Sequence, residues 1–509
     1  MEKVFLSKSK YKRGLKCKKI LWLDKYKKNL SEDNKNRAVL KRGNEVGELA
    51  KGLFGDYEDV EYNDKKSIMI KKTNELMLNK PNIITEASFS YDNNFCSVDI
   101  LKNDIDGVEF YEVKSSNSVK EDHLIDAAYQ YYVLDNLGLN VKKVGIVHLD
   151  GNYRRGKELD INKLFHIEDI TGEVKEQQDE VKNKIYEIKK FMAEYDGSNE
   201  PDIKISGDCC KSYLCNYWKY CRGDVPRPNV FDVPRLKKEK MFDKFHEGVI
   251  SFEDLYNDEG FKELSPNQQF IIEFFVENKE PDINRKEIAE FYEKLKYPLY
   301  FVDYESINPP IPEYEGAYPS QPICFQYSLH IIDENGNCEH KEFLADVDDE
   351  NIPRTFAEKL ARDIPPAKDG EHGSVIVYNK TFEHTRNKEL GEMYVDLEED
   401  MKRINDNIVD FMIPFSNKSY YTKEMLGSTK LKVITPILYP ELDYSNLKLI
   451  HNATEASEGY SRLKNGTLTE KEQEEIKENL KRYCERDTYA LVKMWKTFKK
   501  IARINNSIS

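Results

Sequence analysis

The sequence predicts a multidomain α/β protein, and three observations lead to this expectation. The chain has 509 residues, which exceeds a typical single domain and suggests roughly two to four domains. Short segments typical of strands alternate with helical segments in both halves of the chain. Apolar residues make up 39% of the sequence, which is enough to form hydrophobic cores.

Charge and hydropathy narrow the class of protein. The net charge is −14, from 78 basic and 92 acidic residues, which argues against a protein that coats DNA without specificity. This net charge is compatible with acidic metal sites beside a local basic patch. There is no apolar run of about 18 residues and no secretory signal, so we expect a cytoplasmic protein without membrane spans. The nine cysteines are then expected to bind metal or stay as thiols.

The N-terminal third predicts a sheet framed by helices. Residues 8–28 carry ten Lys or Arg with interleaved apolar residues, which predicts a helix whose basic face lies along phosphates or simply meets solvent. A second helix is expected over 43–54. The remaining expected elements are strands at 83–91, 95–101, 108–113 and 143–149 and a helix at 122–137.

Charged residues on two of these strands suggest a metal-dependent site. Glu112 and Lys114 are two residues apart and share one face of a strand, and Asp99 lies on the strand expected to pair with it. An acid there can hold Mg²⁺, while the lysine orients water or stabilises charge on phosphorus. Gln130, on the next helix, is placed to reach the same edge.

These residues form a recognisable pattern. Asp99, Glu112-Val113-Lys114 and Asp126-x-x-x-Gln130 resemble the motifs of RecB-type PD-(D/E)XK nucleases. The resemblance implies a restriction-endonuclease-like domain over 1–225 that binds Mg²⁺ or Mn²⁺ through Asp99 and Glu112. That group often has a histidine in its first helix where this chain has Gly47. The candidate replacements are Glu45, Glu48 and Glu86, and the sequence does not choose among them.

Three cysteines, Cys209, Cys215 and Cys221, lie within thirteen residues, which indicates a metal site. The fourth ligand must be the adjacent Cys210 or a distant residue, and Cys17 is the N-terminal cysteine outside the predicted strands. This arrangement is similar to that of iron–sulfur RecB-like nucleases, including the CRISPR-associated and AddB-type enzymes. The resemblance implies a [4Fe–4S] cluster on Cys17, Cys209, Cys215 and Cys221, with zinc as the alternative occupant.

Proline spacing predicts the domain boundaries. Residues 222–235 contain three prolines, which mark a linker. Residues 226–296 predict several short helices with two further proline breaks and no residues that suggest chemistry, so we interpret them as a helical connector. The C-terminal domain is expected to occupy 297–509.

The C-terminal domain begins with the apolar strand that contains Asp303. Its predicted order of strand, strand, strand, helix, strand, helix, with the first strand central, fits an RNase H-like fold. The expected strands are 300–306, 323–332, 340–344 and 375–378, and the expected helices are 354–362, 382–390 and about 470–500.

Four carboxylates along this pattern suggest a two-metal site. Asp303 and Glu305 leave the same strand face and would repel each other unless a cation lay between them. Glu383 follows a strand-to-helix junction, and Asp487 shares a helix face with Tyr483. Such acids can bind two divalent ions that activate water and stabilise the leaving oxygen, and the Tyr483 hydroxyl can orient that water.

Three motifs of this domain resemble the DnaQ-like DEDD exonucleases. They are Asp303-x-Glu305, Asn379-x-x-Phe382-Glu383 and Tyr483-x-x-x-Asp487. The resemblance implies a 3′–5′ exonuclease using Mg²⁺ or Mn²⁺ on Asp303, Glu305, Glu383 and Asp487. Glu383 departs from the usual aspartate by one methylene. Asp410 is expected to be structural, and Lys430 and Lys432 are placed to touch phosphate.

Both halves together resemble a bacterial family that joins an iron–sulfur RecB-like nuclease to a DnaQ-like domain. The expectation is a metal-dependent nuclease whose partner is DNA, single-stranded or at ends. Two alternatives stay open. The substrate can be RNA, because backbone contacts serve both nucleic acids. Alternatively, the N-terminal domain grips a strand without cutting it.

Overall fold

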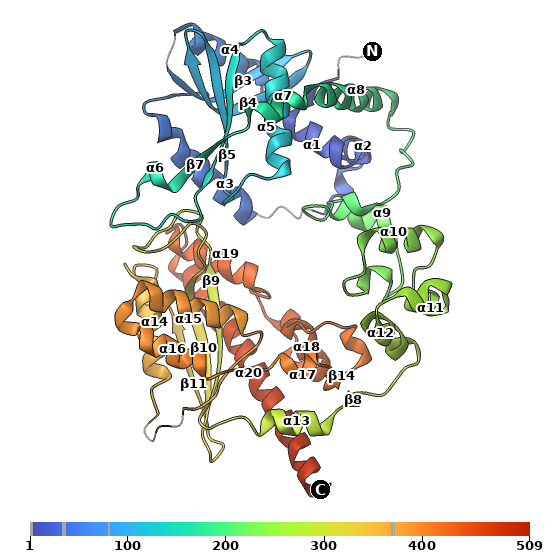
Figure 1. The fold of residues 1–509 in the computed structure, drawn as a ribbon, viewed down its shortest axis with the longest axis vertical. Coiled ribbons are helices and arrows are strands. Elements are labelled where there is room, and N and C mark those ends of the chain that lie inside the picture. The colour runs from blue at the N-terminus through green and yellow to red at the C-terminus, as the bar shows by residue number, and fades with distance from the viewer. Residues whose placement is uncertain (1–3, 33–36, 80–81, 368–369, 371, 509) are drawn as a thin grey trace. The chain divides into compact units, whose positions relative to one another are not determined.

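The computed structural model describes residues 4–32, 37–79, 82–367, 370 and 372–508 (Figure 1). It is a mixed α/β structure with several sheets. Two compact units form. The first comprises Met1–Asp224 and Pro309–Gln321, and the second comprises Val225–Asn308 and Pro322–Ser509. Among the described residues, no helix combines the length and apolar character needed to cross a membrane.

The first unit contains a seven-stranded sheet in the order β2-β3-β4-β5-β6-β7, with β1 also paired to β4. β3, β4 and β5 form an antiparallel meander, and β6 runs parallel to β5. The strands are β1 (Leu6–Ser7), β2 (Glu58–Asp59), β3 (Ile83–Tyr91), β4 (Asn94–Asp104), β5 (Gly107–Lys114), β6 (Val141–Leu149) and β7 (Phe165–Asp169).

Helices cover both faces of this sheet. α3 packs on one face through Val46 and Ala50, whereas α1, α4, α5 and α8 share the core of the other face. The helices are α1 (Lys8–Lys16), α2 (Lys18–Tyr26), α3 (Arg37–Lys51), α4 (Lys66–Asn79), α5 (Glu121–Asn136), α6 (Ile161–Leu164), α7 (Thr171–Glu176), α8 (Gln178–Glu194) and α9 (Trp218–Arg222).

The turn from β4 to β5 shows why the predicted meander forms. Gly107 has a φ of 146°, and a Cβ there would lie 2.3 Å from the carbonyl oxygen of Asn140. Only glycine fits this position. The four predicted strands and the helix at 122–137 are confirmed as β3 to β6 and α5. The single helix expected over 8–28 is wrong, because the chain is extended at Cys17 and forms α1 and α2 instead.

The second unit contains a five-stranded sheet in the order β11-β10-β9-β12-β13. β9, β10 and β11 are antiparallel neighbours, and β12 and β13 run parallel to β9. The central position predicted for the first strand is confirmed. The strands are β8 (Asp282–Ile283), β9 (Leu299–Ile307), β10 (Ile323–Ile332), β11 (Cys338–Leu344), β12 (Val375–Val377), β13 (Ile408–Asp410) and β14 (Tyr420–Tyr421).

Helices form a layer on each face of this sheet. α14, α15 and α16 pack against the face of Tyr300 and Val302, and they lie in front of the strands in Figure 1. α20 packs against the opposite face at Leu299 and Phe301, together with helices of segment 226–296. The helices are α10 (Lys238–Glu247), α11 (Phe252–Asn257), α12 (Pro266–Val276), α13 (Arg285–Tyr292), α14 (Ile352–Asp363), α15 (Thr381–Met393), α16 (Glu398–Asp406), α17 (Ile413–Ser416), α18 (Leu431–Leu438), α19 (Ala453–Lys464) and α20 (Glu470–Ile508).

Candidate functional site

Side chains alternate between the two faces of β9, and two carboxylates lie on the face that packs against α20. Leu299 and Phe301 pack against that helix, and Asp303 and Glu305 continue the same face of the strand. Asp487 meets them from α20, and one carboxylate oxygen from each of these three residues lies within 4.8 Å of the others. The structure therefore brings together three of the four acids that the sequence suggested for this site.

The fourth acid, Glu383, approaches from the start of α15. It lies outside the group of three, yet its charge raises the pKa of both Asp303 and Glu305. Glu383 is buried, and its Oε2 has no hydrogen-bond partner within the described residues. A buried carboxylate oxygen without a partner is costly, so this atom is suited to a cation.

Asp410 fixes the turn that presents Glu383. Its carboxylate accepts hydrogen bonds from the backbone N–H groups of Asn379, at 2.8 Å, and Lys380, at 3.1 Å. Asn379 has a φ of 65°, a conformation that asparagine tolerates better than most residues. These contacts match the structural role predicted for Asp410.

Burial disfavours the charged forms of all four acids, and repulsion by neighbouring carboxylates adds to this effect at Asp303 and Glu305. Burial, followed by the charge of Asp487, raises the pKa of Glu305 to about 8 and that of Asp303 well above its usual value. Burial also raises the pKa of Asp487 to about 6, although Lys432 opposes the shift. The pKa of Glu383 rises to about 8, again through burial first. A divalent cation would relieve this repulsion.

Two tyrosines and a lysine border the carboxylates. Lys432 donates a hydrogen bond to the Tyr483 hydroxyl and lies 4.5 Å from the centre of its ring. Tyr444 donates a hydrogen bond to Asp487, a contact that sequence reasoning missed. Burial and the nearby acids raise the pKa of Tyr483 far above its usual range, so it stays a neutral phenol that can donate a hydrogen bond.

These pKa shifts predict how the stability of the cation-free protein depends on pH. The folded acids hold protons that the unfolded chain has released above about pH 4.5, so the free energy of unfolding should fall as pH rises from 5.5 to 8. We expect a loss on the order of 3 kcal/mol for each of Glu305 and Glu383, measured by denaturant titration with chelator. Mn²⁺ should reverse it. Glu305→Gln should make the fall in stability with pH less steep, because Glu383 and Asp303 still titrate. A stability that rises over this range would contradict the prediction.

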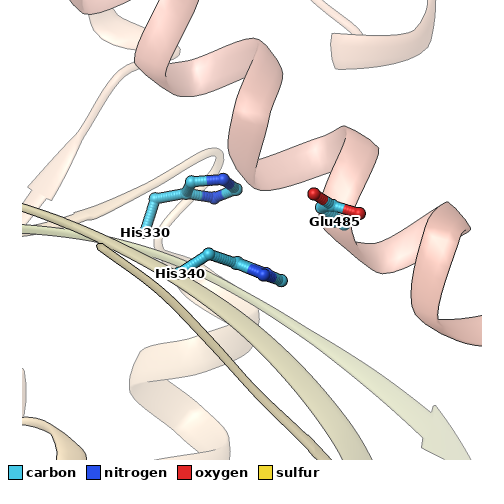
Figure 2. Close-up of side chains that lie close together, drawn as sticks. All are labelled: His330, His340 and Glu485. Atoms are coloured by element: carbon cyan, nitrogen blue, oxygen red, sulfur yellow. The ribbon is translucent and has the colours of Figure 1, made fainter. Parts of the chain in front are cut away.

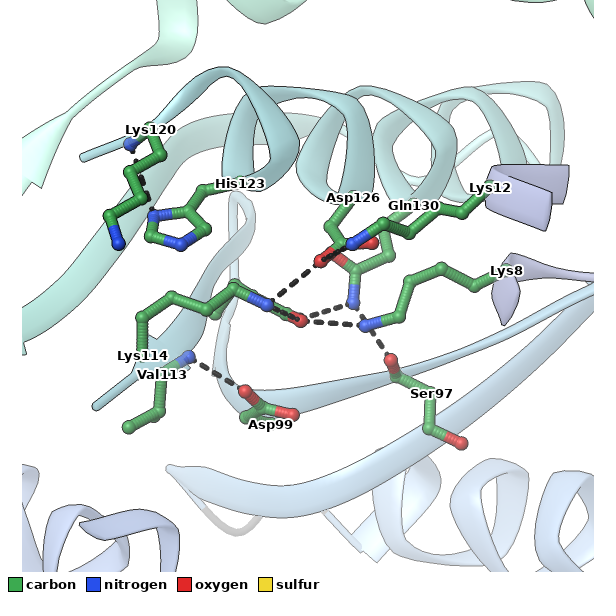
Figure 3. Close-up of polar contacts among 11 residues, drawn as sticks. Lys8, Lys12, Ser97, Asp99, Val113, Lys114, Lys120, His123, Asp126 and Gln130 are labelled. Atoms are coloured by element: carbon green, nitrogen blue, oxygen red, sulfur yellow. Dashed lines mark hydrogen bonds and ion pairs between the residues drawn. The ribbon is translucent and has the colours of Figure 1, made fainter. Parts of the chain in front are cut away.

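The first unit holds a second polar cluster, on β4, β5 and α5 (Figure 3). Lys114 Nζ lies 2.8 Å from both Glu112 and Asp126, and Gln130 donates to Glu112 at 2.6 Å. Asp99 lies at the adjacent strand and accepts a 2.6 Å hydrogen bond from the N–H of Val113. The structure thus brings together the residues that the sequence suggested for this site.

Two lysines of α1 enter the same cluster. Lys8 Nζ lies 2.6 Å from Glu112, and Lys12 Nζ lies 3.1 Å from Asp126 (Figure 3). Burial alone would raise the pKa of Glu112, but Lys114 and Lys8 outweigh it and hold the pKa well below its usual range. The lysines therefore act as counter-ions here, unlike the poorly compensated acids of the second unit.

The structure separates the three candidates for the first-helix ligand. Glu45 and Glu48 are exposed on α3, where they pair with Lys41 and Lys51. Glu86, on β3, has a φ of 55° and lies near Asp99, whose pKa it helps to raise. Burial, followed by the charge of Glu112, raises the pKa of Asp99 to about 7. Of the three candidate ligands, Glu86 is therefore the one that lies near Asp99.

Four cysteines line one pocket of the first unit: Cys17, Cys209, Cys215 and Cys221. The break between α1 and α2 places Cys17 there, and Cys210 is not among the lining residues. Lys16 ties α1 to the cysteine loop by donating to the carbonyl oxygens of Lys211 and Tyr213 at 3.0 and 2.6 Å. Burial raises the pKa of Cys221 to about 11, so a bound metal would have to displace a proton.

The donor atoms of this pocket bear on the kind of metal. Among the described residues, its lining includes four cysteines and no histidine or carboxylate, and such a thiolate set suits zinc as well as an iron–sulfur cluster.

Comparisons with known proteins identify distant relatives. A family model described as "Domain of unknown function (DUF2779)" matches residues 300–430. An uncharacterized protein of Ureaplasma parvum serovar 3 is 26% identical over 242 residues, covering 43% of this chain and 34% of that protein. An uncharacterized protein of Mycoplasma genitalium is 26% identical over 219 residues, covering 40% and 32%.

The chain spans about a third of the length of the curated relatives that it matches. No solved structure matches it. The family match covers β9 to β14, with Asp303, Glu305 and Glu383, and ends before Tyr483 and Asp487. The family model relates residues 300–430 to the DUF2779 domain. None of these matches names a RecB-like or DnaQ-like nuclease.

Proposed function

We propose that this protein is a metal-dependent nuclease whose C-terminal domain removes nucleotides from a 3′ end. The observation that carries the proposal is the cluster of Asp303, Glu305 and Asp487, with Glu383 nearby. Four acids converge there with Lys432 as the main opposing charge, and their pKa values are raised. Proteins rarely bury such a cluster unless cations occupy it.

The sheet order supports an RNase H-like domain. The central strand β9 has the hairpin partners β10 and β11 on one side and the parallel strands β12 and β13 on the other. This is the arrangement expected from the likeness to DnaQ-like exonucleases. The α-β-β-β-α-β order of the first unit likewise supports a restriction-endonuclease-like domain.

The protein's own residues suit phosphodiester hydrolysis. Asp303, Glu305, Glu383 and Asp487 would hold Mg²⁺ or Mn²⁺, which supplies Lewis acidity toward the phosphate and the water when bound. Tyr483 keeps its proton and can orient a water by hydrogen bonding. Tyr444 holds Asp487 in place, and Lys432, next to the Tyr483 hydroxyl, would supply positive charge to a bound phosphate.

For the N-terminal domain we propose a RecB-like nuclease unit closed by a [4Fe–4S] cluster on Cys17, Cys209, Cys215 and Cys221. Its Asp99, Glu112 and Lys114 match the positions of a PD-(D/E)XK site. A second candidate function, binding without cutting, is favoured by Lys8 and Lys12, which already neutralise Glu112 and Asp126.

The test of the proposal is degradation of 5′-labelled single-stranded DNA and RNA by anaerobically purified protein in Mn²⁺. We expect a ladder that shortens from the 3′ end with wild-type protein and is absent with Asp303→Ala. A comparison of the DNA and RNA ladders shows whether the protein prefers deoxyribose or ribose. Equal ladders from wild type and Asp303→Ala would overturn the C-terminal assignment.

The same assay separates the two roles of the N-terminal domain. If this domain cuts, Lys114→Ala should remove products that persist in Asp303→Ala. If it only grips, Lys114→Ala should leave the pattern of products unchanged.

A further inference from the structure

Two histidines and a glutamate meet at a place separate from the carboxylate cluster (Figure 2). His330 on β10 and His340 on β11 are directly opposite in the antiparallel pairing, so their side chains share one face of the sheet. Glu485 reaches them from α20. One ligand atom from each of the three residues lies within 4.8 Å of the others.

Hydroxyl groups already hold one nitrogen of each imidazole ring. His330 Nδ1 lies 2.9 Å from Thr488 Oγ1, and His340 Nε2 lies 2.9 Å from Ser328 Oγ. The second ring nitrogen of each histidine has no hydrogen bond within the described part of the chain. Histidines that bind metals commonly use one nitrogen in this way, which orients the ring and leaves the other nitrogen for the metal.

We propose that His330, His340 and Glu485 bind one Zn²⁺-type transition-metal ion, with water completing the coordination, and that this ion ties β10 and β11 to α20. Two imidazoles and one carboxylate form a borderline donor set that suits such ions better than Mg²⁺. Nothing in the likeness to nucleases calls for this site.

The distances and burial of the three residues are compatible with the ion. Ligands about 2.0–2.1 Å from tetrahedral zinc are roughly 3.3 Å apart, so the observed group must close by up to about 1.5 Å. Glu485 is exposed and can make this adjustment, while His340 is held by Ser328 and His330 is fixed by burial. Burial, followed by His340 and Lys496, lowers the pKa of His330 to about 4, which keeps this ligand neutral.

The position of the site on α20 gives it a structural consequence. Glu485 lies two residues before Asp487. Thr488, which forms a hydrogen bond with His330, is the residue directly after Asp487. An ion bound here would therefore hold the helical turn that presents Asp487. This inference does not depend on the proposed nuclease activity.

The test is the zinc content of the full-length protein after dialysis against Zn²⁺ and removal of unbound metal, measured by elemental analysis. The other metal sites stay the same in every sample, so the difference between variants reports this site alone. We expect His340→Gln and Glu485→Gln each to bind one zinc ion fewer per chain than wild type. The matched control, His246→Gln, replaces an exposed histidine of α10 and should keep the wild-type content.

A thermal melt gives the second readout. Zn²⁺ should raise the unfolding midpoint of wild type and of His246→Gln and leave that of Glu485→Gln unmoved. Glu485 is exposed, so this variant keeps the test decisive even if His340→Gln folds poorly. Equal zinc content in wild type and Glu485→Gln would overturn the proposal, because the ions would then be held elsewhere.

Discussion

Asp487→Asn is expected to abolish 3′ trimming while making the cation-free protein more stable. Asparagine keeps the shape and can still accept the hydrogen bond from Tyr444, but it removes one of three acids that lie within 4.8 Å of one another. We expect trimming to fall by a factor on the order of 10³, because the transition state loses a preorganised charge. Labelled-strand assays in Mn²⁺ measure the loss.

The stability of the same variant provides an independent check. Removing a buried charge that repels Asp303 and Glu305 should raise the unfolding midpoint in chelator and reduce the stabilisation by Mn²⁺. Glu478→Gln is the matched control, because it neutralises an exposed acid on the same helix. Trimming by Asp487→Asn at the rate of this control would show that Asp487 does not take part in the reaction.

Cys215→Ser is expected to remove the metal of the cysteine pocket and destabilise the first unit. The four cysteines come from segments almost two hundred residues apart, so a bound cluster would link the ends of this unit. Metal-binding free energy in such sites contributes directly to folding. We expect anaerobic wild-type protein to contain about four iron atoms per chain, which Cys215→Ser loses together with cooperative unfolding of the unit.

Cys210→Ser is the matched control for this experiment. It makes the same chemical change next to Cys209 but at a residue that does not line the pocket. This variant should keep the iron and the wild-type melting curve. A single zinc ion per chain in wild type would refute the iron–sulfur assignment, and iron loss in Cys210→Ser would refute the choice of Cys17 as the fourth ligand.

Local sequence signals predicted the sheets well, because each depends on neighbouring residues. The meander of β3, β4 and β5 follows from alternation and from turns that contain asparagine and glycine. The break at Cys17 escaped prediction, since lysines on both sides favour a continuous helix. The extended backbone of Cys17 occurs where this residue lines the cysteine pocket, a tertiary contact that local sequence does not report.

The candidate sites show the same limit. Spacing within β9 and α20 correctly paired Asp303 with Glu305 and Tyr483 with Asp487. Tyr444 was missed because it lies in an irregular segment with no periodic pattern. Spacing also could not show that Glu383 lies outside the tight group, since that distance depends on how α15 packs.

Lys8 and Lys12 were predicted to belong to a basic helix face, but not to enter the acidic cluster. Lys8 meets Glu112 across 104 positions of sequence, and no local pattern reports such a contact. Both lysines belong to a segment that was expected to face either phosphates or solvent. The structure instead places these two side chains against carboxylates.

This arrangement of lysines has a thermodynamic consequence if the first unit binds a phosphate backbone. A phosphate that attracts Lys8 and Lys12 would uncover negative charge on Glu112 and Asp126, and a divalent cation would then bind there more tightly. Linkage requires the reverse effect with equal strength, so the cation would raise the affinity for nucleic acid by the same factor. The pair of lysines would thus make the occupancy of the metal site conditional on the presence of a strand.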